Sequence, residues 1–229
     1  MSEEDSDTFR SPLGTKQHWD EVYQLEINNF EDHGDIGEVW FGEQVQRKVI
    51  RYISETLNVP LNTPIFDIGT GNGAFLFALA EEGYHELFGS DYSEPSVNFC
   101  RIQQATFTED KTIPETAHFT FFVSNFLEDD AKTPNGGNFY SVIHDKGTYD
   151  AIHLDPDIDK EKYYTALKNC LAPGGVFAIT SCNWTEDELI AYFVRQDGYL
   201  KELTRISNKT FSFGGKEGNT VSTVLFKRE

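Results

Sequence analysis

Short apolar runs alternate with helix-compatible stretches along most of the chain. Apolar runs with the length of buried strands cover residues 64–68, 87–91, 119–123, 176–180 and a segment that begins at Tyr140. Stretches that predict helices lie between or after them, at residues 73–82, 95–107, 157–171 and 185–195. Strands that alternate with helices predict an α/β fold, with a mostly parallel sheet and helices on both of its faces.

The last part of the chain predicts a different strand arrangement. Residues 199–206 and 220–226 have strand-like patterns, and a loop over residues 211–215 lies between them. No crossover helix fits into so short a connection, so these two strands must pair antiparallel. A mostly parallel sheet that ends in an antiparallel hairpin differs from the pattern of dinucleotide-dependent oxidoreductases, which argues against NAD as the ligand.

The first part of the chain carries helical patterns. Residues 1–12 are rich in acidic side chains, and we expect them to form a disordered arm. A helix is predicted over residues 15–23, and an amphipathic helix is predicted over residues 43–58. A polar run that contains glycine, residues 28–38, separates the two helices.

The composition fits one folded domain. The chain has 229 residues, of which 38% are hydrophobic and 14% aromatic, enough for a sizeable core. We expect residues 13–229 to form a single domain, with residues 13–58 as an N-terminal helical cap. The formal net charge of −19 disfavours a nucleic-acid partner and favours a basic partner or simple solubility.

The cysteine, histidine and hydropathy patterns indicate the cellular compartment and the absence of a metal site. Cys100, Cys170 and Cys182 form no close pair, which predicts a reducing compartment, no structural disulfide and no zinc site. The histidines show no metal-ligand spacing, so no metal is expected. No apolar run approaches the ~20 residues of a membrane helix, and no signal peptide is visible. We expect a cytoplasmic protein, monomeric and without a membrane partner.

A glycine-rich turn follows the first predicted strand, in the sequence Asp67-Ile68-Gly69-Thr70-Gly71-Asn72-Gly73. A strand, a glycine turn and a helix in this order are typical of the opening of a nucleotide-binding α/β domain. Asp67 would repel a pyrophosphate, whereas S-adenosylmethionine carries a sulfonium and an ammonium group and no phosphate. Asp91 ends the second predicted strand, where such folds place the carboxylate that binds ribose hydroxyls. Its alternative role is to cap the following helix.

Two further segments contain side chains whose roles the sequence leaves open. Trp40 and Phe41 either fill the core or form a wall over a bound ligand. The strand that begins at Tyr140 runs into a charged glycine turn that contains Asp145 and should face the same crevice as the first glycine turn. Lys146 and Asp150 either belong to this site or form a surface ion pair.

These motifs resemble those of the seven-strand, Rossmann-like S-adenosylmethionine-dependent methyltransferases, through the glycine turn and Asp91. The chain is more closely similar to the lysine methyltransferases that act on translation elongation factor 1-alpha. The stretches that carry this closer resemblance are residues 14–20, 40–42, 145–152, 179–185 and 211–215. At Asn125 the family usually has an aspartate, which accepts a hydrogen bond from the adenine amine. Asparagine also accepts through its carbonyl oxygen, but without charge.

The resemblance implies a Rossmann-like seven-strand methyltransferase fold, the cofactor S-adenosylmethionine, and translation elongation factor 1-alpha as the protein substrate. A small-molecule methyltransferase of the same fold is the alternative. The cofactor-binding residues that the resemblance implies are Trp40, Asp67, Gly69, Gly71, Gly73, Asp91, Tyr92, Asn125, Phe126 and Asp145. The implied catalytic residues are Asp145, Tyr149 and Asn183. Trp184 and Phe213 are implied in binding the substrate, and the alternative role of Trp184 is to pack the core.

Overall fold

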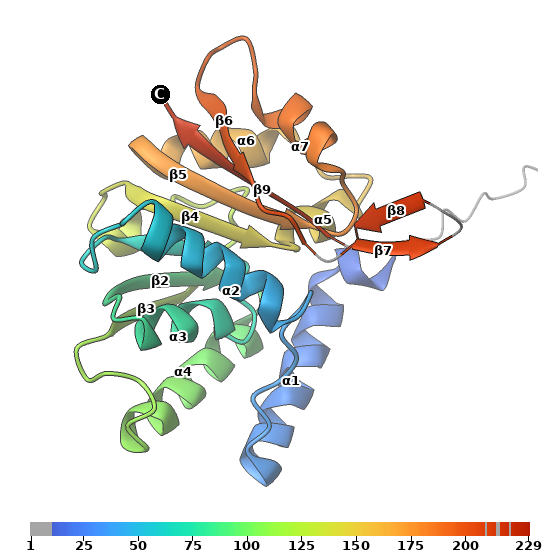
Figure 1. The fold of residues 1–229 in the computed structure, drawn as a ribbon. Coiled ribbons are helices and arrows are strands. Elements are labelled where there is room, and N and C mark those ends of the chain that lie inside the picture. The colour runs from blue at the N-terminus through green and yellow to red at the C-terminus, as the bar shows by residue number, and fades with distance from the viewer. Residues whose placement is uncertain (1–10, 209, 214–215, 220) are drawn as a thin grey trace, which may run out of the picture.

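The predicted strands assemble into one seven-stranded sheet (Figure 1). The computed structural model describes residues 11–208, 210–213, 216–219 and 221–229, without the side chains of residues 210–213 and 216–219. The strands of the sheet are β1 (Ile65–Ile68), β2 (Glu86–Asp91), β3 (His118–Val123), β4 (Tyr140–Lys146), β5 (Leu171–Ser181), β6 (Leu200–Arg205) and β9 (Ser222–Arg228). They follow the order β3-β2-β1-β4-β5-β9-β6. The strands β1 to β5 pair in parallel, and β9 pairs antiparallel with β5 and β6, as the sequence predicted.

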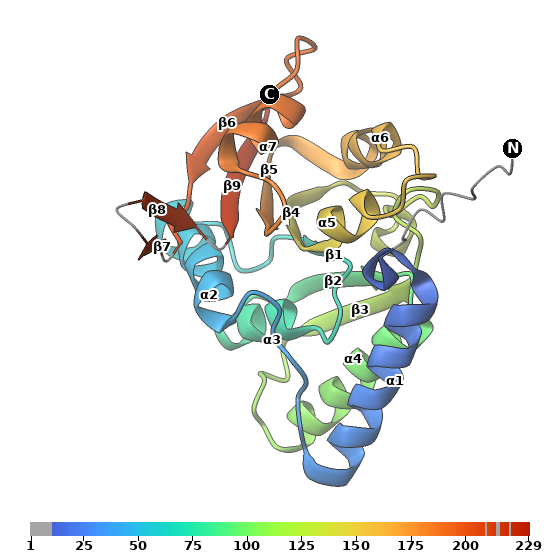
Figure 2. The same ribbon diagram turned by 90° about the vertical axis from the view of Figure 1, so that its right-hand side faces the viewer.

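Helices cover both faces of this sheet (Figures 1 and 2). On one face lie α2 (Glu43–Arg51), with its π-helical continuation η2 (Tyr52–Thr56), α3 (Ala74–Glu81) and α4 (Glu94–Glu109). On the other face lie α5 (Thr148–His153), α6 (Glu161–Cys170) and α7 (Glu186–Phe193). The remaining helical elements are η1 (Pro12–Gly14), α1 (Lys16–His33) and η3 (Thr133–Asn135). Helix α7 begins at the predicted capping box, formed by Thr185 and Glu188.

Each face of the sheet has its own apolar core, because successive side chains of a strand point to opposite faces. In β1, Ile65 packs into the core under α2, α3 and α4, and Phe66 packs into the core under α5, α6 and α7. The same alternation in β4 sends His144 and Asp145 to opposite faces. One residue along a strand thus decides which layer of the molecule a polar side chain enters.

Helix α1 packs against α4 at one side of the sheet (Figure 2). Tyr23 and Ile27 form a small core with Phe99 of α4, and the rings of Phe30 and Phe99 lie 5.7 Å apart between centroids. Because these apolar residues extend the helical stripe, α1 continues to His33, well into the run that the sequence assigned to a polar connection. Gly34, with a φ of 71°, ends it.

Two segments differ from the sequence prediction. The charged glycine turn after β4 is followed at once by α5. Residues 211–213, expected to belong to a loop, lie in β7 (Thr210–Phe213), which pairs antiparallel with β8 (Lys216–Asn219). Residues 1–10 of the predicted acidic arm lie outside the described residues. Within the described part of the chain, no helix combines the length and the apolar character needed to cross a membrane.

Candidate active site

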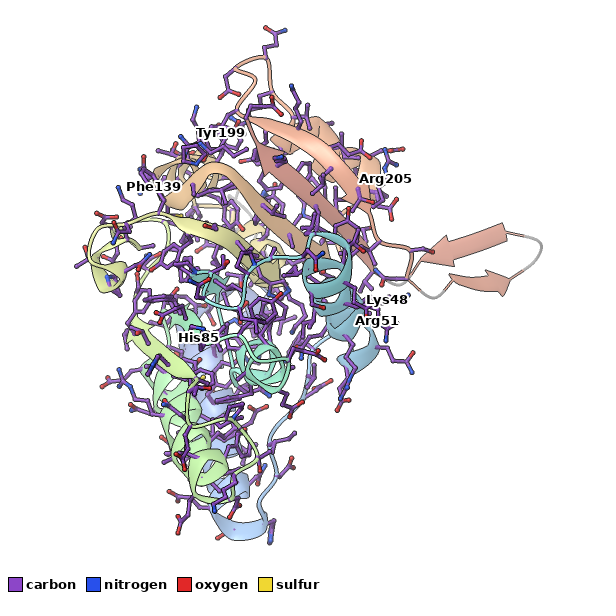
Figure 3. All side chains as sticks on the ribbon, turned by 60° about the vertical axis from the view of Figure 1, so that its left-hand side comes forward. Lys48, Arg51, His85, Phe139, Tyr199 and Arg205 are labelled. Carbon is purple, nitrogen blue, oxygen red and sulfur yellow. The ribbon has the colours of Figure 1, made fainter. Side chains whose placement is uncertain are left out.

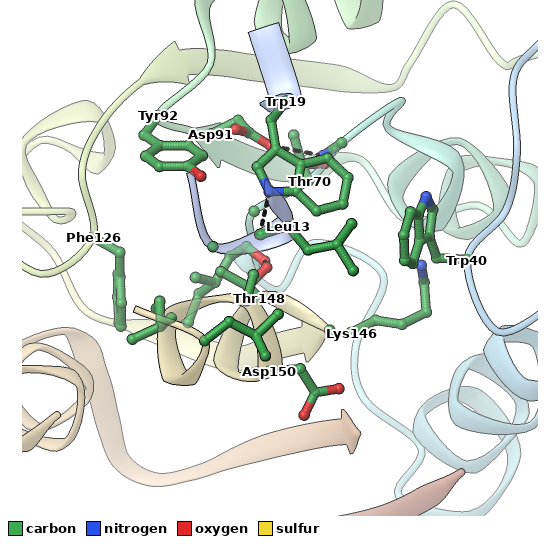
Figure 4. Close-up of a pocket in the computed structure, with 18 of the residues that line it drawn as sticks. Leu13, Trp19, Trp40, Thr70, Asp91, Tyr92, Phe126, Lys146, Thr148 and Asp150 are labelled. Carbon is green, nitrogen blue, oxygen red and sulfur yellow. Dashed lines mark hydrogen bonds between the residues drawn. The ribbon is translucent and has the colours of Figure 1, made fainter. Parts of the chain in front are cut away.

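A cavity of about 320 Å³ opens at the carboxyl ends of the parallel strands (Figure 4). It lies where the strand order reverses, because β1 has β2 on one side and β4 on the other. Its volume falls within the range of ~300–1,000 Å³ that is usual for small-molecule sites. Residues that line it include Leu13, Trp19, Trp40, Asp91, Tyr92, Phe126, Lys146, Thr148 and Asp150.

The glycine turn after β1 contributes Gly69 and Gly71 to the cavity wall. Gly69, Gly71 and Gly73 have φ values of 61°, 58° and 75°, in the left-handed region that favours glycine. A Cβ atom on Gly71 would lie 2.7 Å from the hydroxyl of Tyr23, and one on Gly69 would lie 2.0 Å from Oγ1 of Thr148. The turn therefore requires glycine for its conformation and for its close packing against α1 and α5. Gly73 does not line the cavity and packs against side chains of α3 and α4.

Asp91 ends β2 and lines the cavity. One of its carboxylate oxygens accepts a hydrogen bond from the Ser93 N–H at 2.9 Å, and the other accepts from the Gly71 N–H at 3.2 Å. Burial raises the pKa of Asp91 to about 6, although these donors oppose the shift. Ser93, and not Asp91, is the N-cap of α4. The carboxylate is thus fixed at the tip of the second strand, where the sequence predicted a ribose-binding group.

The structure places Asp67 beneath the glycine turn and not in the cavity wall. One carboxylate oxygen accepts a hydrogen bond from the Thr70 hydroxyl at 2.9 Å, and the other lies 2.7 Å from Nδ1 of His144. Only 4% of Asp67 is exposed. Asp67 does not line the cavity, and its direct contact with a cationic ligand stays a prediction. The carboxylate holds the turn and joins β1 to β4.

Tyr92, Asn125 and Phe126 line the cavity near the ends of β2 and β3, and their contact with the cofactor stays a prediction. The carbonyl oxygen of the Asn125 side chain accepts a hydrogen bond from the Leu127 N–H at 3.1 Å. The Asn125 N–H donates to Asp129 at 2.7 Å. The Asn125 carbonyl that the sequence assigned to an adenine amine therefore also stabilises the turn after β3.

Residues of the N-terminal segment form another part of the cavity wall. Leu13, Trp19, Tyr23, Trp40 and Phe41 all line it. The indole N–H of Trp19 donates to the Leu13 carbonyl at 2.9 Å, and the rings of Trp19 and Trp40 meet edge to face at 5.2 Å between centroids. Of the two roles that the sequence left open for Trp40 and Phe41, the structure favours a wall over a bound ligand.

Asp145 is completely buried and does not line the cavity. Its carboxylate accepts hydrogen bonds from the N–H groups of Thr148 and Tyr149 at 3.0 and 3.1 Å, and from the Tyr163 hydroxyl at 2.7 Å. Strand alternation sends it toward α5 and α6, whereas the neighbouring His144 faces α3. The carboxylate points away from the cavity, and its contact with the cofactor and the substrate lysine stays a prediction. Its carboxylate anchors the start of α5.

Tyr149 and Trp184 belong to an aromatic cluster on the same face of the sheet. The Tyr149 ring lies 4.1, 5.6 and 5.8 Å from the rings of His153, Tyr192 and Trp184, between centroids. Neither Tyr149 nor Trp184 lines the cavity. Trp184 packs against the buried core, which is one of the two roles that the sequence left open for it, and the contact of Tyr149 with a substrate lysine stays a prediction. Phe213 ends β7, and its side chain lies outside the described part of the chain.

Asn183 lines the cavity, as predicted, and so does Asp150. The Asp150 carboxylate accepts hydrogen bonds from the Ser181 hydroxyl and from the Cys182 N–H. The Ser181 hydroxyl oxygen in turn accepts from the N–H groups of Asn183 and Trp184, at 3.1 and 3.0 Å. Asp150 and Ser181 therefore fix the loop that carries Asn183 to the cavity, and Asp150 is not paired with Lys146.

Sequence reasoning assigned Trp19 and Tyr23 only to the apolar side of a helix, and it gave no role to Thr148. The roles of Tyr23 and Thr148 depend on contacts between residues far apart in the sequence, because Tyr23 lies close to Gly71 and Thr148 lies close to Gly69. All three cysteines are free thiols. Within the described part of the chain, no group of three or more His, Cys, Asp or Glu side chains is placed to hold a metal ion.

Comparison with known proteins gives this geometry a context. A family model described as a methyltransferase domain matches residues 61–223. EEF1A lysine methyltransferase 2 of Mus musculus is 39% identical over 225 residues, which cover 97% of this chain and 86% of that protein. Protein-lysine N-methyltransferase efm4 of Schizosaccharomyces pombe is 32% identical over 239 residues, which cover 95% of this chain and 94% of that protein.

A similar fold occurs among solved structures. The magnesium protoporphyrin IX methyltransferase of Synechocystis PCC 6803 with bound S-adenosylmethionine has a TM-score of 0.59 and 15% sequence identity. The match covers 91% of this chain and 97% of that one. At this identity the similarity establishes the fold and nothing about the substrate.

Proposed function

Since the chain belongs to the methyltransferase family, and within it to the family of EEF1A lysine methyltransferase 2, we propose that it methylates a lysine of translation elongation factor 1-alpha. It is an S-adenosylmethionine-dependent protein-lysine N-methyltransferase. The observation that carries the choice of substrate is the similarity over nearly the whole chain, which reaches far beyond the glycine turn shared by a very large superfamily.

The volume of the cavity and the polar groups that line it support the assignment to this cofactor. We assign the ribose hydroxyls to Asp91, whose carboxylate is held in place by two backbone N–H groups. Gly69 and Gly71 let the main chain approach the ligand, and Tyr92, Asn125 and Phe126 surround the adenine. S-adenosylmethionine, when bound, supplies an electrophilic methyl group. The protein has to bind this donor, exclude water and align an acceptor amine.

Asn183 and Asp150 define the acceptor side of the cavity in this proposal. A lysine amine at its free pKa of ~10.4 is mostly protonated, so the site must favour the neutral amine in line with the methyl group. The Asn183 side chain offers a carbonyl oxygen that orients an amine N–H. The Asp150 carboxylate already accepts two hydrogen bonds, and its role is to position the loop of Asn183.

Three further features belong to the same proposal. Residues 13–58 act as a helical cap over the cofactor, because Leu13, Trp19 and Trp40 line the cavity from this segment. The enzyme works as a monomer in the cytoplasm, where the elongation factor takes part in translation. The alternative, a small-molecule methyltransferase, has no support beyond the shared fold.

The proposal is tested with purified protein, tritiated S-adenosylmethionine and two acceptor pools. One pool is purified translation elongation factor 1-alpha, and the other is the small-molecule fraction of a cytosolic extract. We expect label on the elongation factor, and mass spectrometry should place the added methyl groups on a lysine. Label that enters only the small-molecule pool would contradict the proposed substrate. Asn183→Ala, which removes the side-chain amide at the acceptor side, should reduce the transfer.

A further inference from the structure

Lys146 is a residue of the cavity to which the proposed function gives no role. It ends β4, and its side chain lines the cavity. Figure 4 shows it extending from the end of β4 toward Trp40. Among the described residues that line the cavity, Lys146 is the one with a basic side chain, whereas Glu38, Asp91 and Asp150 are acidic.

The Lys146 ammonium has no hydrogen bond or ion pair to any described residue. Burial lowers the pKa of Lys146, and the carboxylates of Asp67, Asp145 and Glu38 oppose that shift from beyond ion-pair distance. Asp67 and Asp145 are already satisfied, the first by Thr70 and His144 and the second by the start of α5. A half-buried cation without a bonded counter-ion is a ready site for an anionic group.

The surroundings of Lys146 are built to keep it in this position. The ring of Phe41 lies 5.9 Å from the Lys146 ammonium, measured to the ring centroid. Phe41 has a φ of 64°. Residues other than glycine rarely adopt such a φ value, and bulky side chains seldom do so. Gly147 leaves room for this ring, because a Cβ atom there would lie 3.2 Å from it. Backbone strain of this kind is typical of positions that shape a binding site.

The strand order indicates which anion reaches Lys146. Asp91 ends β2 and Lys146 ends β4, and β1 with its glycine turn lies between them. Strands are spaced by ~4.8 Å, so the two side chains start about 10 Å apart across the sheet. A donor whose ribose sits at Asp91 extends its amino-acid end across the glycine turn toward β4. That end carries the only carboxylate of S-adenosylmethionine.

We propose that the ammonium of Lys146 binds the carboxylate at the methionine end of the methyl donor. Lys146 is then the residue that distinguishes the intact donor from adenosine-containing compounds that lack this carboxylate. The inference rests on the proposed function for the identity of the donor. It adds a binding residue that the glycine turn and Asp91 do not supply.

The test is a binding cycle with two ligands and two proteins, measured by calorimetry. The ligands are S-adenosylmethionine and decarboxylated S-adenosylmethionine, which lacks only the carboxylate. The wild-type protein should bind the intact donor about tenfold or more tightly than the decarboxylated one, as expected for a charge-assisted hydrogen bond. Lys146→Gln should lose this preference by weakening the intact donor alone. Lys146→Arg should keep most of it.

Lys132→Gln is the matched control, because Lys132 also lies over a phenylalanine ring, that of Phe139, but does not line this cavity. It removes the same charge and should leave both affinities unchanged. A Lys146→Gln protein that retains the preference, or that weakens both ligands equally, would overturn the proposal. The cycle needs no protein substrate, so a wrong elongation-factor assignment would show only as absent transfer and would leave these affinities intact.

Discussion

The Nδ1 atom of His144 lies 2.7 Å from a carboxylate oxygen of Asp67, and both side chains are buried. The contact joins β4 to β1 at the point where the strand order reverses. The His144 ring also stacks on Phe75 of α3, at 3.6 Å between centroids. Burial lowers the pKa of His144, although Asp67 opposes the shift, so the neutral ring donates its Nδ1–H to the carboxylate.

Removing this donor should destabilise the protein. His144→Ala leaves a buried carboxylate oxygen of Asp67 without its hydrogen bond, which should lower the free energy of unfolding by about 1.5–3 kcal/mol. Urea denaturation at neutral pH measures the loss. The control is His85→Ala, because His85 is a half-buried surface residue 3.8 Å from Glu86 and should change the stability little (Figure 3). Equal effects of the two substitutions would show that the contact with Asp67 contributes nothing.

Asp145 should reveal its role through pH. Burial raises the pKa of Asp145 to about 7, and the hydrogen bonds from Tyr163 and Tyr149 oppose the shift. The folded-state pKa lies above the unfolded value of ~3.9, so the stabilisation from this group is complete below pH ~4 and is lost as the pH rises through 7. Asp145→Asn lacks this titration. The wild-type protein should therefore lose about 2.5 kcal/mol relative to the variant between pH 5 and pH 8.

Urea denaturation of both proteins at the two pH values measures this difference. Groups such as Asp91, whose pKa burial also raises, are present in both proteins and largely cancel. The Asp145→Asn protein should retain cofactor affinity and turnover in proportion to its folded fraction. A pH-independent stability difference, together with lost turnover in a folded variant, would return Asp145 to a direct catalytic role.

The sequence predicted the sheet because its strands are short apolar runs with clear boundaries. It predicted the position of Asp91 because this residue ends the strand-like run that follows the glycine turn and the first helix. It placed Asp145 and Tyr149 at the correct end of the correct strand. The rule that ligands bind at carboxyl ends identifies an edge of the sheet. It does not identify the face, and alternation along β4 turns Asp145 into the core.

Residues of the N-terminal segment were harder to assign for a different reason. Trp19 and Tyr23 have the spacing of an amphipathic helix, which indicates that one side is covered but not what covers it. Tyr23 lies far from Gly71 in sequence, and its hydroxyl fills the space that a Cβ atom on Gly71 would occupy. Lys146 was equally ambiguous, because a lysine followed by an acidic residue four positions later also suits a surface ion pair.

The hydroxyl of Ser181 should control the acceptor side of the cavity. It donates to Asp150 and accepts from the N–H groups of Asn183 and Trp184, so Ser181→Ala frees the loop that carries Asn183. Turnover on translation elongation factor 1-alpha should fall by about tenfold or more, because misplacing an aligned group costs rate steeply. The affinity for S-adenosylmethionine should not change.

Thr185→Ala is the control for this loop. Thr185 caps α7 in the same connection, and its loss should cost ~1 kcal/mol of stability without affecting turnover at a temperature where the protein is folded. Initial rates, cofactor affinity and melting temperature are measured on both variants. Normal turnover in folded Ser181→Ala protein would show that this hydrogen-bond network does not position Asn183 for methyl transfer.

The cavity at the ends of β1, β2 and β4 is assigned to the methyl donor, with Asp91 as its ribose-binding carboxylate. Calorimetry with S-adenosylhomocysteine and with NAD tests this on three proteins: wild type, Asp91→Ala and Asp150→Asn. The wild type and Asp150→Asn should bind S-adenosylhomocysteine equally and NAD not at all. Asp91→Ala should bind S-adenosylhomocysteine at least ~tenfold more weakly, since two charge-assisted hydrogen bonds are lost. An unchanged dissociation constant in folded Asp91→Ala protein, or heat released only with NAD, would contradict the account.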